Sequence, residues 1–246
     1  MFGCRAFTIA VGLVLATGVI FALFPVLDLA GARLFGTSAG FILNTDRDMR
    51  GLRQIGLLIP FAVSCACLVA LAWLVFQPGV RLFTDARNLV AILITFAVGP
   101  GLLVNFVLKD HWHRPRPAQI QEFGGSAEFR AWWDTSGECR TNCSFVSGEV
   151  AGATAMVMVA AVMPTAVAGS ALIVAIVFAV GVALLRLAFG GHFLSDVIFA
   201  ALFTHIVGIL VFALMHDERW RLGRPGELEE ILGGLGSRLR RRFRCL

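Results

Sequence analysis

The sequence predicts an all-α, polytopic membrane protein built as a bundle of six transmembrane helices. Hydrophobic residues make up 58% of the 246 residues, and the mean hydropathy is +0.81. An ordinary soluble domain does not need that much apolar surface, and the apolar runs are long enough to cross a hydrocarbon core of about 30 Å. The six runs cover residues 6–30, 55–77, 88–108, 145–163, 165–189 and 193–215.

Two of these runs carry a feature that needs an explanation. The first run contains Ala30-Gly31-Ala32, which resembles a signal-peptide cleavage site. Its apolar stretch is longer than that of a typical signal peptide, so we expect a retained helix. The fourth run is the weakest, because Ser147, Gly148 and Glu149 interrupt its first turn.

The domain organisation follows from the runs. Residues 1–216 form one membrane domain, in which the loop 109–145 carries part of the predicted site, and residues 217–246 form a basic tail. Six crossings place both termini on one side of the membrane and this loop on the other. Basic residues divide almost evenly between the two sides of the membrane. If Lys109, Arg116 and Arg186 are left out, because the site discussed below requires them, the side with the termini has more basic residues. The remaining excess predicts cytoplasmic termini by the positive-inside rule.

Cysteine usage agrees with that topology. Cys139 and Cys143 lie close together in the loop 109–145. A disulfide between them would require an oxidising compartment, although two free thiols are an equally good interpretation.

The tail has an amphipathic pattern. Apolar residues recur at helical spacing before the basic ending RLRRRFR, at Leu228, Ile231, Leu232, Leu235 and Leu239. This pattern predicts a segment that lies on anionic lipid. A disordered basic tail that fixes the topology is the alternative, and no nucleic-acid partner is expected.

The first polar cluster is KDHWHRPRP, at the exit of the third run. Lys109 is the only lysine beside twenty arginines, and an ammonium is a compact charge that a guanidinium does not reproduce. Arg116 follows seven residues later, so the two can share a helix face, whereas Arg114 would point elsewhere. A basic belt at the lipid headgroups is the alternative interpretation.

The second cluster is SGE, where the fourth run begins. Ser147 and Gly148 ahead of a helix can bind an anion through free N–H groups, a hydroxyl and the helix dipole. Glu149 follows at the membrane edge, where an unpaired carboxylate is costly. A serine N-cap with an acidic first turn is the simpler interpretation.

The third cluster is RLAFGGHFLSD, between the last two runs. A helix that begins near His192 places Asp196 one turn later, where its carboxylate can orient the imidazole and leave one ring nitrogen free to attack. Arg186 lies across a short glycine turn and can clamp a phosphoryl group. A purely structural His–Asp pair is the alternative.

Together, the three clusters resemble the motifs K-x6-RP, SG-x and R-x5-H-x3-D of the type 2 phosphatidic acid phosphatase (PAP2) superfamily. The resemblance covers roughly residues 88 to 200 and pairs Lys109 with Arg116 rather than with Arg114. It implies hydrolysis of a phosphomonoester through a phosphohistidine, without metal or cofactor. The implied nucleophile is His192, held by Asp196, and the implied phosphate ligands are Lys109, Arg116, Ser147, Gly148 and Arg186.

The sequence departs from the family pattern at two positions. Glu149 replaces the usual histidine of SGH, so it stands where the general acid belongs, and Leu185 replaces a common serine. The SGE form resembles bacterial members of the family that act on lipid A. His111 and His113 are further candidates for the acid, or for a metal site with Glu149, although their spacing is poor for a helical ligand pair.

The resemblance therefore favours a lipid-phosphate phosphatase of a bacterial inner membrane, with its site facing the periplasm and lipid A or a related glycolipid as substrate. Undecaprenyl diphosphate and phosphatidylglycerol phosphate are alternative substrates. A phosphotransferase would use the same residues, and a non-catalytic lipid-binding protein would have lost its acid when Glu149 replaced histidine.

Overall fold

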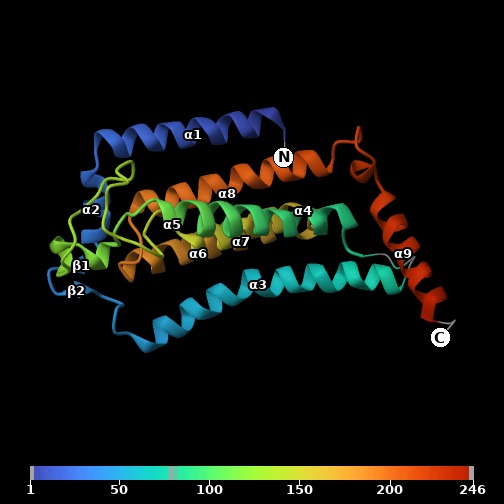
Figure 1. Cartoon of the computed structure of the whole chain (residues 1–246), viewed down its shortest axis with the longest axis horizontal. Coiled ribbons are helices and arrows are strands. Elements are labelled where there is room, and N and C mark those ends of the chain that lie inside the picture. Colours follow the sequence, from blue (N-terminus) through green and yellow to red (C-terminus); the bar gives the residue numbers. More distant parts are fainter. Residues whose placement is uncertain (1–2, 78–79, 81, 244–246) are drawn as a thin grey trace.

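The computed structural model describes residues 3–77, 80 and 82–243 and is predominantly helical (Figure 1). Within them, five helices are long and apolar enough to cross a membrane. They are α1 (Cys4–Leu23), α3 (Arg47–Phe76), the continuous helix of α4 (Ala86–Phe96), η1 (Ala97–Leu108) and α5 (Lys109–His111), α7 (Thr165–Ala188) and α8 (Leu194–Met215). The predicted all-α, polytopic membrane fold is confirmed.

The fourth predicted span differs from the expectation. Helix α6 (Gly148–Ala161) has 14 residues, so it is about 21 Å long and does not reach across the hydrocarbon core by itself. The Ser147 hydroxyl accepts a hydrogen bond from the Val150 amide and fixes where the helix begins. The bundle therefore has five helices of spanning length in its described part, together with one shorter helix.

Helix α6 lies at the centre of the bundle, where most of its side chains are buried. It is rich in alanine and glycine, which let neighbouring helices approach closely. It packs against α7, α8, α3 and η1, so its first turn, which carries the SGE motif, is surrounded by the ends of other helices.

The two ends of the bundle differ in character (Figure 1). The loop 109–145 lies at one end, together with the short elements α2 (Val26–Arg33), β1 (Gly36–Thr37), β2 (Gly40–Phe41), η2 (Pro117–Gln119) and η3 (Gln121–Phe123). Strands β1 and β2 pair antiparallel. The start of α1 and the last helix lie at the other end, because six consecutive helices in the described part of the bundle, α6 among them, alternate in direction.

The loop 109–145 is an ordered cap. The Trp132 indole donates to the Gly18 carbonyl of α1 at 3.3 Å, and the Trp112 indole donates to the Trp132 carbonyl. A disulfide joins Cys139 and Cys143. These bonds tie the loop both to itself and to the first helix.

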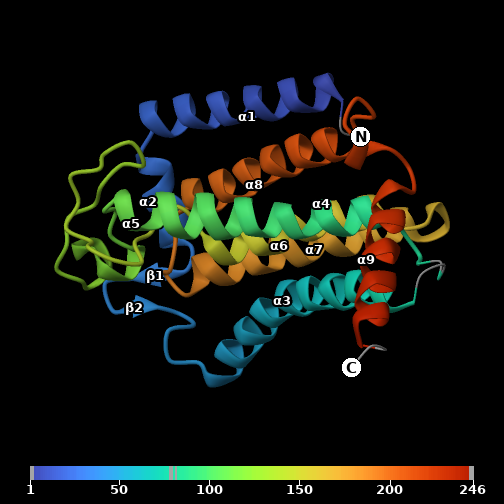
Figure 2. The ribbon, with the colours of Figure 1, turned by 45° about the vertical axis from the view of Figure 1, so that its right-hand side comes forward.

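The tail forms helix α9 (Glu227–Phe243), preceded by η4 (Arg221–Gly223), and it crosses the ends of α3 and α4 (Figure 2). Glu229 Oε1 accepts from the Ala86 amide at 2.7 Å, and Arg240 Nη1 donates to the Phe76 carbonyl at 2.6 Å. The tail thus caps two helices of the bundle and is not the disordered segment considered above. Residues 244–246 lie outside the described part.

Candidate active site

His192 is buried between α7 and α8, and its ring orientation is set by a backbone carbonyl. Nδ1 lies 2.6 Å from the Ser144 carbonyl oxygen. A carbonyl only accepts, so Nδ1 carries the proton and Nε2 keeps its lone pair. Within the described residues, Nε2 forms no hydrogen bond. The geometry presents Nε2 as a nucleophile.

The electrostatic surroundings keep His192 neutral. Burial is the largest cause that lowers the pKa of this imidazole well below its usual 6.5. The nearby charges of Arg186, Arg116 and Lys109 lower this pKa further. The three cations, which come from two separate motifs, therefore lie close to His192 in space.

The predicted role of Asp196 needs a correction. Its Oδ2 lies 3.9 Å from His192 Nδ1, too far for a hydrogen bond. Asp196 Oδ2 instead accepts from the Ser144 hydroxyl at 2.5 Å and from the Phe193 amide at 2.8 Å. The Asp196 carboxylate therefore binds the Ser144 side chain, and the Ser144 backbone carbonyl binds the His192 ring.

A buried charge network that the motifs do not reveal supports this arrangement. Arg114 is fully buried and donates to Asp196 Oδ1 at 2.6 Å and to Asp28 Oδ2 at 2.7 Å. Asp28 also accepts from the amide and the hydroxyl of Ser195, at 2.8 Å and 2.7 Å. The Arg114 guanidinium lies 4.2 Å from the centre of the Phe193 ring. The network joins α2, the loop 109–145 and the start of α8.

The sequence did contain one signal for this network. Asp28 lies inside the first predicted apolar run, 6–30, and an acidic residue in such a run is expected to have a buried partner. The partner is Arg114, whose spacing from Lys109 places it on a different helix face. In the structure, Arg114 binds Asp196 and Asp28 of this network.

Arg186 lies at the end of α7 and is 3% exposed. Its side chain covers Gly191, where any Cβ would overlap the guanidinium. Arg186 Nη1 is 3.4 Å from Glu149 Oε1, and its buried Nε has no hydrogen-bond partner among the described residues. A buried guanidinium with an unused donor is suited to bind an anion.

Glu149 is bound by a second arginine that the motifs did not predict. Arg53 of α3 donates from Nε to both carboxylate oxygens at 3.0 Å, and from Nη2 to Oε1 at 2.6 Å. This two-pronged contact is the geometry of a guanidinium with an ionised carboxylate. Arg53 lies outside the predicted runs, because α3 begins at Arg47, eight residues before the second predicted run.

The remaining predicted ligands surround the same space. Lys109 Nζ is 3.4 Å from Asn105 Oδ1, and that amide lies so close to Gly148 that no Cβ fits there. The Ser147 hydroxyl oxygen accepts from the Val150 amide at 3.4 Å, which leaves its proton for another acceptor. Gly148 is the first residue of α6, so the N-terminus of the helix at this position supplies free backbone amides and the positive end of the helix dipole.

Arg116 is positioned by the segment next to the disulfide. Its Nη2 donates to the Asn142 carbonyl at 2.7 Å, and the amide of Cys143 donates to the Lys109 carbonyl at 3.3 Å. Burial is the first cause that lowers the pKa of Arg116, and the positive charge of Arg53 is the second. Both arginines therefore belong to one crowded cluster of cations.

The two loop histidines have other contacts. His111 Nδ1 lies 2.8 Å from the Val107 carbonyl, and His113 Nδ1 lies 2.8 Å from the Cys139 carbonyl. Within the part of the chain that the structure describes, no group of three His, Cys, Asp or Glu side chains is placed to hold a metal ion. His111 and His113 thus form no ligand set with Glu149.

Comparison with known proteins identifies the family. Residues 88–220 match the sequence profile of the PAP2 superfamily. The chain belongs to this superfamily. The family predicted from the three motifs is therefore confirmed, and the matched residues contain every predicted site residue.

Two similar proteins each cover more than four fifths of the chain. A lipid A 4'-phosphatase of Francisella tularensis subsp. novicida (strain U112) is 33% identical over 221 residues, which are 87% of this chain and 98% of that protein. A lipid A 4'-phosphatase of Rhizobium leguminosarum is 31% identical over 81% of this chain and 92% of that protein. No solved structure is significantly similar to the chain.

Proposed function

We propose that this PAP2 protein is a membrane phosphatase that hydrolyses a phosphomonoester on lipid A through a phosphohistidine. The observation that carries the proposal is the His192 Nε2 lone pair, which is held beside the cations Lys109, Arg116 and Arg186. A neutral, oriented nucleophile next to clustered positive charge is what attack on a phosphate dianion requires.

In the first step, His192 Nε2 attacks phosphorus and the bond from phosphorus to the lipid oxygen breaks. Arg186, Arg116 and Lys109 stabilise the negative charge on the equatorial oxygens, together with the Gly148 amide and the Ser147 hydroxyl. In the second step, water attacks phosphorus, the N–P bond breaks and phosphate leaves. His192 Nδ1 keeps its proton throughout and donates it in a hydrogen bond to the Ser144 carbonyl, so Asp196 acts as a positioning residue through Ser144.

Glu149 is the residue that we assign to proton transfer. At rest its carboxylate binds Arg53 and lies 3.4 Å from Arg186. An arriving phosphate competes for these guanidinium groups and frees Glu149 to take up a proton. Glu149 takes this proton from solvent, gives it to the leaving lipid oxygen and recovers one from the attacking water. It releases that proton to solvent when phosphate leaves and its carboxylate binds Arg53 again, so the cycle balances.

Lipid A is the favoured substrate because both similar proteins described above are lipid A 4'-phosphatases. The SGE motif, which distinguishes this chain from the usual SGH pattern, supports the same choice. Undecaprenyl diphosphate and phosphatidylglycerol phosphate are the alternatives for the test.

We place the protein in a bacterial inner membrane with the site facing the periplasm. The Cys139–Cys143 disulfide supports this orientation, since disulfides persist in oxidising compartments. At the opposite end of the bundle, the exposed Arg238 and Arg241 of α9 would then face anionic lipid of the cytoplasmic leaflet.

The experiment is phosphate release by detergent-purified protein from lipid A and from the two alternative lipid phosphates, in the presence of EDTA. His192→Ala is the matched inactive variant. Release that survives EDTA and disappears in the variant supports the proposal. A phosphorylated acceptor without free phosphate would indicate a transferase, and lipid binding without turnover would indicate a non-catalytic protein.

The role of Glu149 has its own test. Glu149→Gln cannot donate a proton, so it should lose about 10²- to 10⁴-fold in kcat on a lipid, whose alkoxide is a poor leaving group. The same variant should lose much less on para-nitrophenyl phosphate, whose leaving group needs no proton. Equal losses on both substrates would assign Glu149 to binding alone.

A further inference from the structure

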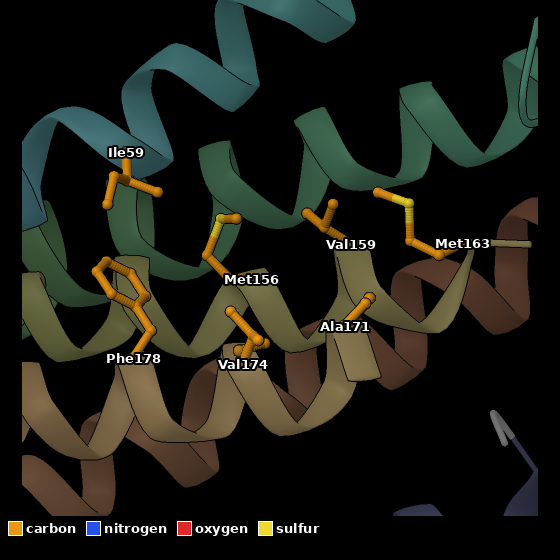
Figure 3. A pocket seen from close by; sticks show the side chains of 9 residues that line it. Ile59, Met156, Val159, Met163, Ala171, Val174 and Phe178 are labelled. Atoms are coloured by element: carbon orange, nitrogen blue, oxygen red, sulfur yellow. The ribbon is translucent and has the colours of Figure 1, made fainter. Parts of the chain in front are cut away.

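Two apolar hollows lie end to end between α3 and α7, on a side of the bundle that faces the membrane. Helix α6 also borders the deeper one, which Figure 3 shows. Their volumes are about 270 and 310 Å³, and they share Ile59 and Phe178. We call them together the α3–α7 furrow. Leu52 and Leu185 line one end of the furrow, and Met163 and Ala171 line the other end.

At one end of this furrow, two lining residues are the chain neighbours of arginines of the cation cluster. Leu52 precedes Arg53 in α3, and Leu185 precedes Arg186 in α7. These two arginines are the ones that bind Glu149. A molecule whose anionic group lies at Arg186 would therefore have the furrow directly below that group.

The furrow has the length of a lipid chain. Leu185 and Ala171 are 14 residues apart on α7, which corresponds to about 21 Å along the helix axis. One leaflet contributes about 15 Å of hydrocarbon, half of the bilayer core. The furrow is thus long enough to hold one acyl chain over the full depth of its leaflet.

Local packing explains why the furrow is hollow. The residues of α3 that are buried, Cys67 and Leu74, both belong to its second half, so the half beside the furrow stands away from the bundle. On α7, an added Cβ at Gly181 would meet no atom within 4 Å. Met156 and Met163 line the deeper part, and their flexible thioethers can adapt to a chain.

We infer that the α3–α7 furrow holds one acyl chain of the phosphorylated lipid while its phosphate lies at Arg186; this inference rests on the proposed function. The hydrophobic effect does not drive this binding, because the surrounding lipid is as apolar as the furrow. The anionic head is held by the cations, and the furrow fixes the direction in which the chain leaves. Its contribution is orientation of the phosphate toward His192.

The first test fills the furrow. Gly181→Phe places a ring in it, whereas Gly169→Phe places the same ring elsewhere on α7, where an added Cβ also meets nothing within 4 Å. Both changes remove a helical glycine, so both variants should fold. We expect Gly181→Phe to lower kcat/KM for lipid A by at least about tenfold and to leave para-nitrophenyl phosphate hydrolysis unchanged. Gly169→Phe should change neither rate, and equal rates on lipid A for the two variants would overturn the inference.

A second measurement does not depend on turnover. A lipid phosphate with a photoreactive diazirine on its acyl chain should label peptides that contain Ile59 and Phe178, and unlabelled lipid phosphate should compete. The exposed apolar face of α1 is the control surface. Equal labelling of α1 and the furrow would show ordinary bilayer contact and refute the inference. If the wild type released no phosphate from any substrate, the proposed function would fail, and the labelling would still decide the furrow.

Discussion

The buried network around Arg114 makes a specific prediction about Asp28. The change Asp28→Asn keeps the shape of the side chain and removes its charge. Asp28 is 1% exposed, and its two oxygens accept three hydrogen bonds, one from Arg114 and two from Ser195. An asparagine has one acceptor oxygen and an amide that donates, so at least one of these buried donors loses its acceptor.

The size of the effect follows from the burial. Arg114 is fully buried and would keep only Asp196 as a counter-charge. Removing one partner of a buried ion pair costs about 3–5 kcal/mol, because the other charge is left without full compensation. For a chain of this length, such a loss corresponds to a fall in Tm of about 6–20 °C.

The assay is thermal unfolding of the detergent-purified protein, followed by intrinsic tryptophan fluorescence. The matched control is Glu128→Gln, which breaks an exposed pair with Arg130 at 3.0 Å. A surface pair contributes at most about 1 kcal/mol, so the control should melt close to the wild type. If Asp28→Asn and Glu128→Gln shift Tm equally, the network does not stabilise this end of the bundle.

Three further predictions concern other parts of the molecule. Because the pKa of His192 is lowered in the folded protein, the unfolded chain takes up a proton first as the pH falls. Below about pH 6.5, the Tm of the wild type should therefore fall faster than the Tm of His192→Gln. Parallel curves of Tm against pH for the two proteins would contradict this. Replacing both Cys139 and Cys143 by serine should cost about 2 kcal/mol, and dithiothreitol should lower the Tm of the wild type but not of the double variant. Glu229→Ala removes the acceptor for the Ala86 amide and should cost about 0.5–2 kcal/mol in thermal unfolding. The kcat on lipid A should stay unchanged, because α9 lies at the end of the bundle opposite the site. A loss of kcat would show that the two ends are coupled.

Much of the fold and the candidate site could be predicted from the sequence. Long apolar runs predict membrane helices because backbone polar groups in lipid must be satisfied within the chain. The resemblance of the three motifs to the PAP2 pattern groups Lys109, Arg116, Arg186 and His192, and the structure brings these residues together. The run 145–163 was predicted too long, since Ser147 caps the helix and the residues before it join the loop that covers the site.

Other features were decided only by the tertiary structure. His192 is oriented by a backbone carbonyl, and every residue has one, so no sequence pattern distinguishes Ser144 for that role. Glu149 and Arg53 are 96 positions apart, and Arg114 and Asp28 are 86 apart. A local pattern shows that a buried charge needs a partner, but the identity of that partner depends on which helix ends meet in space.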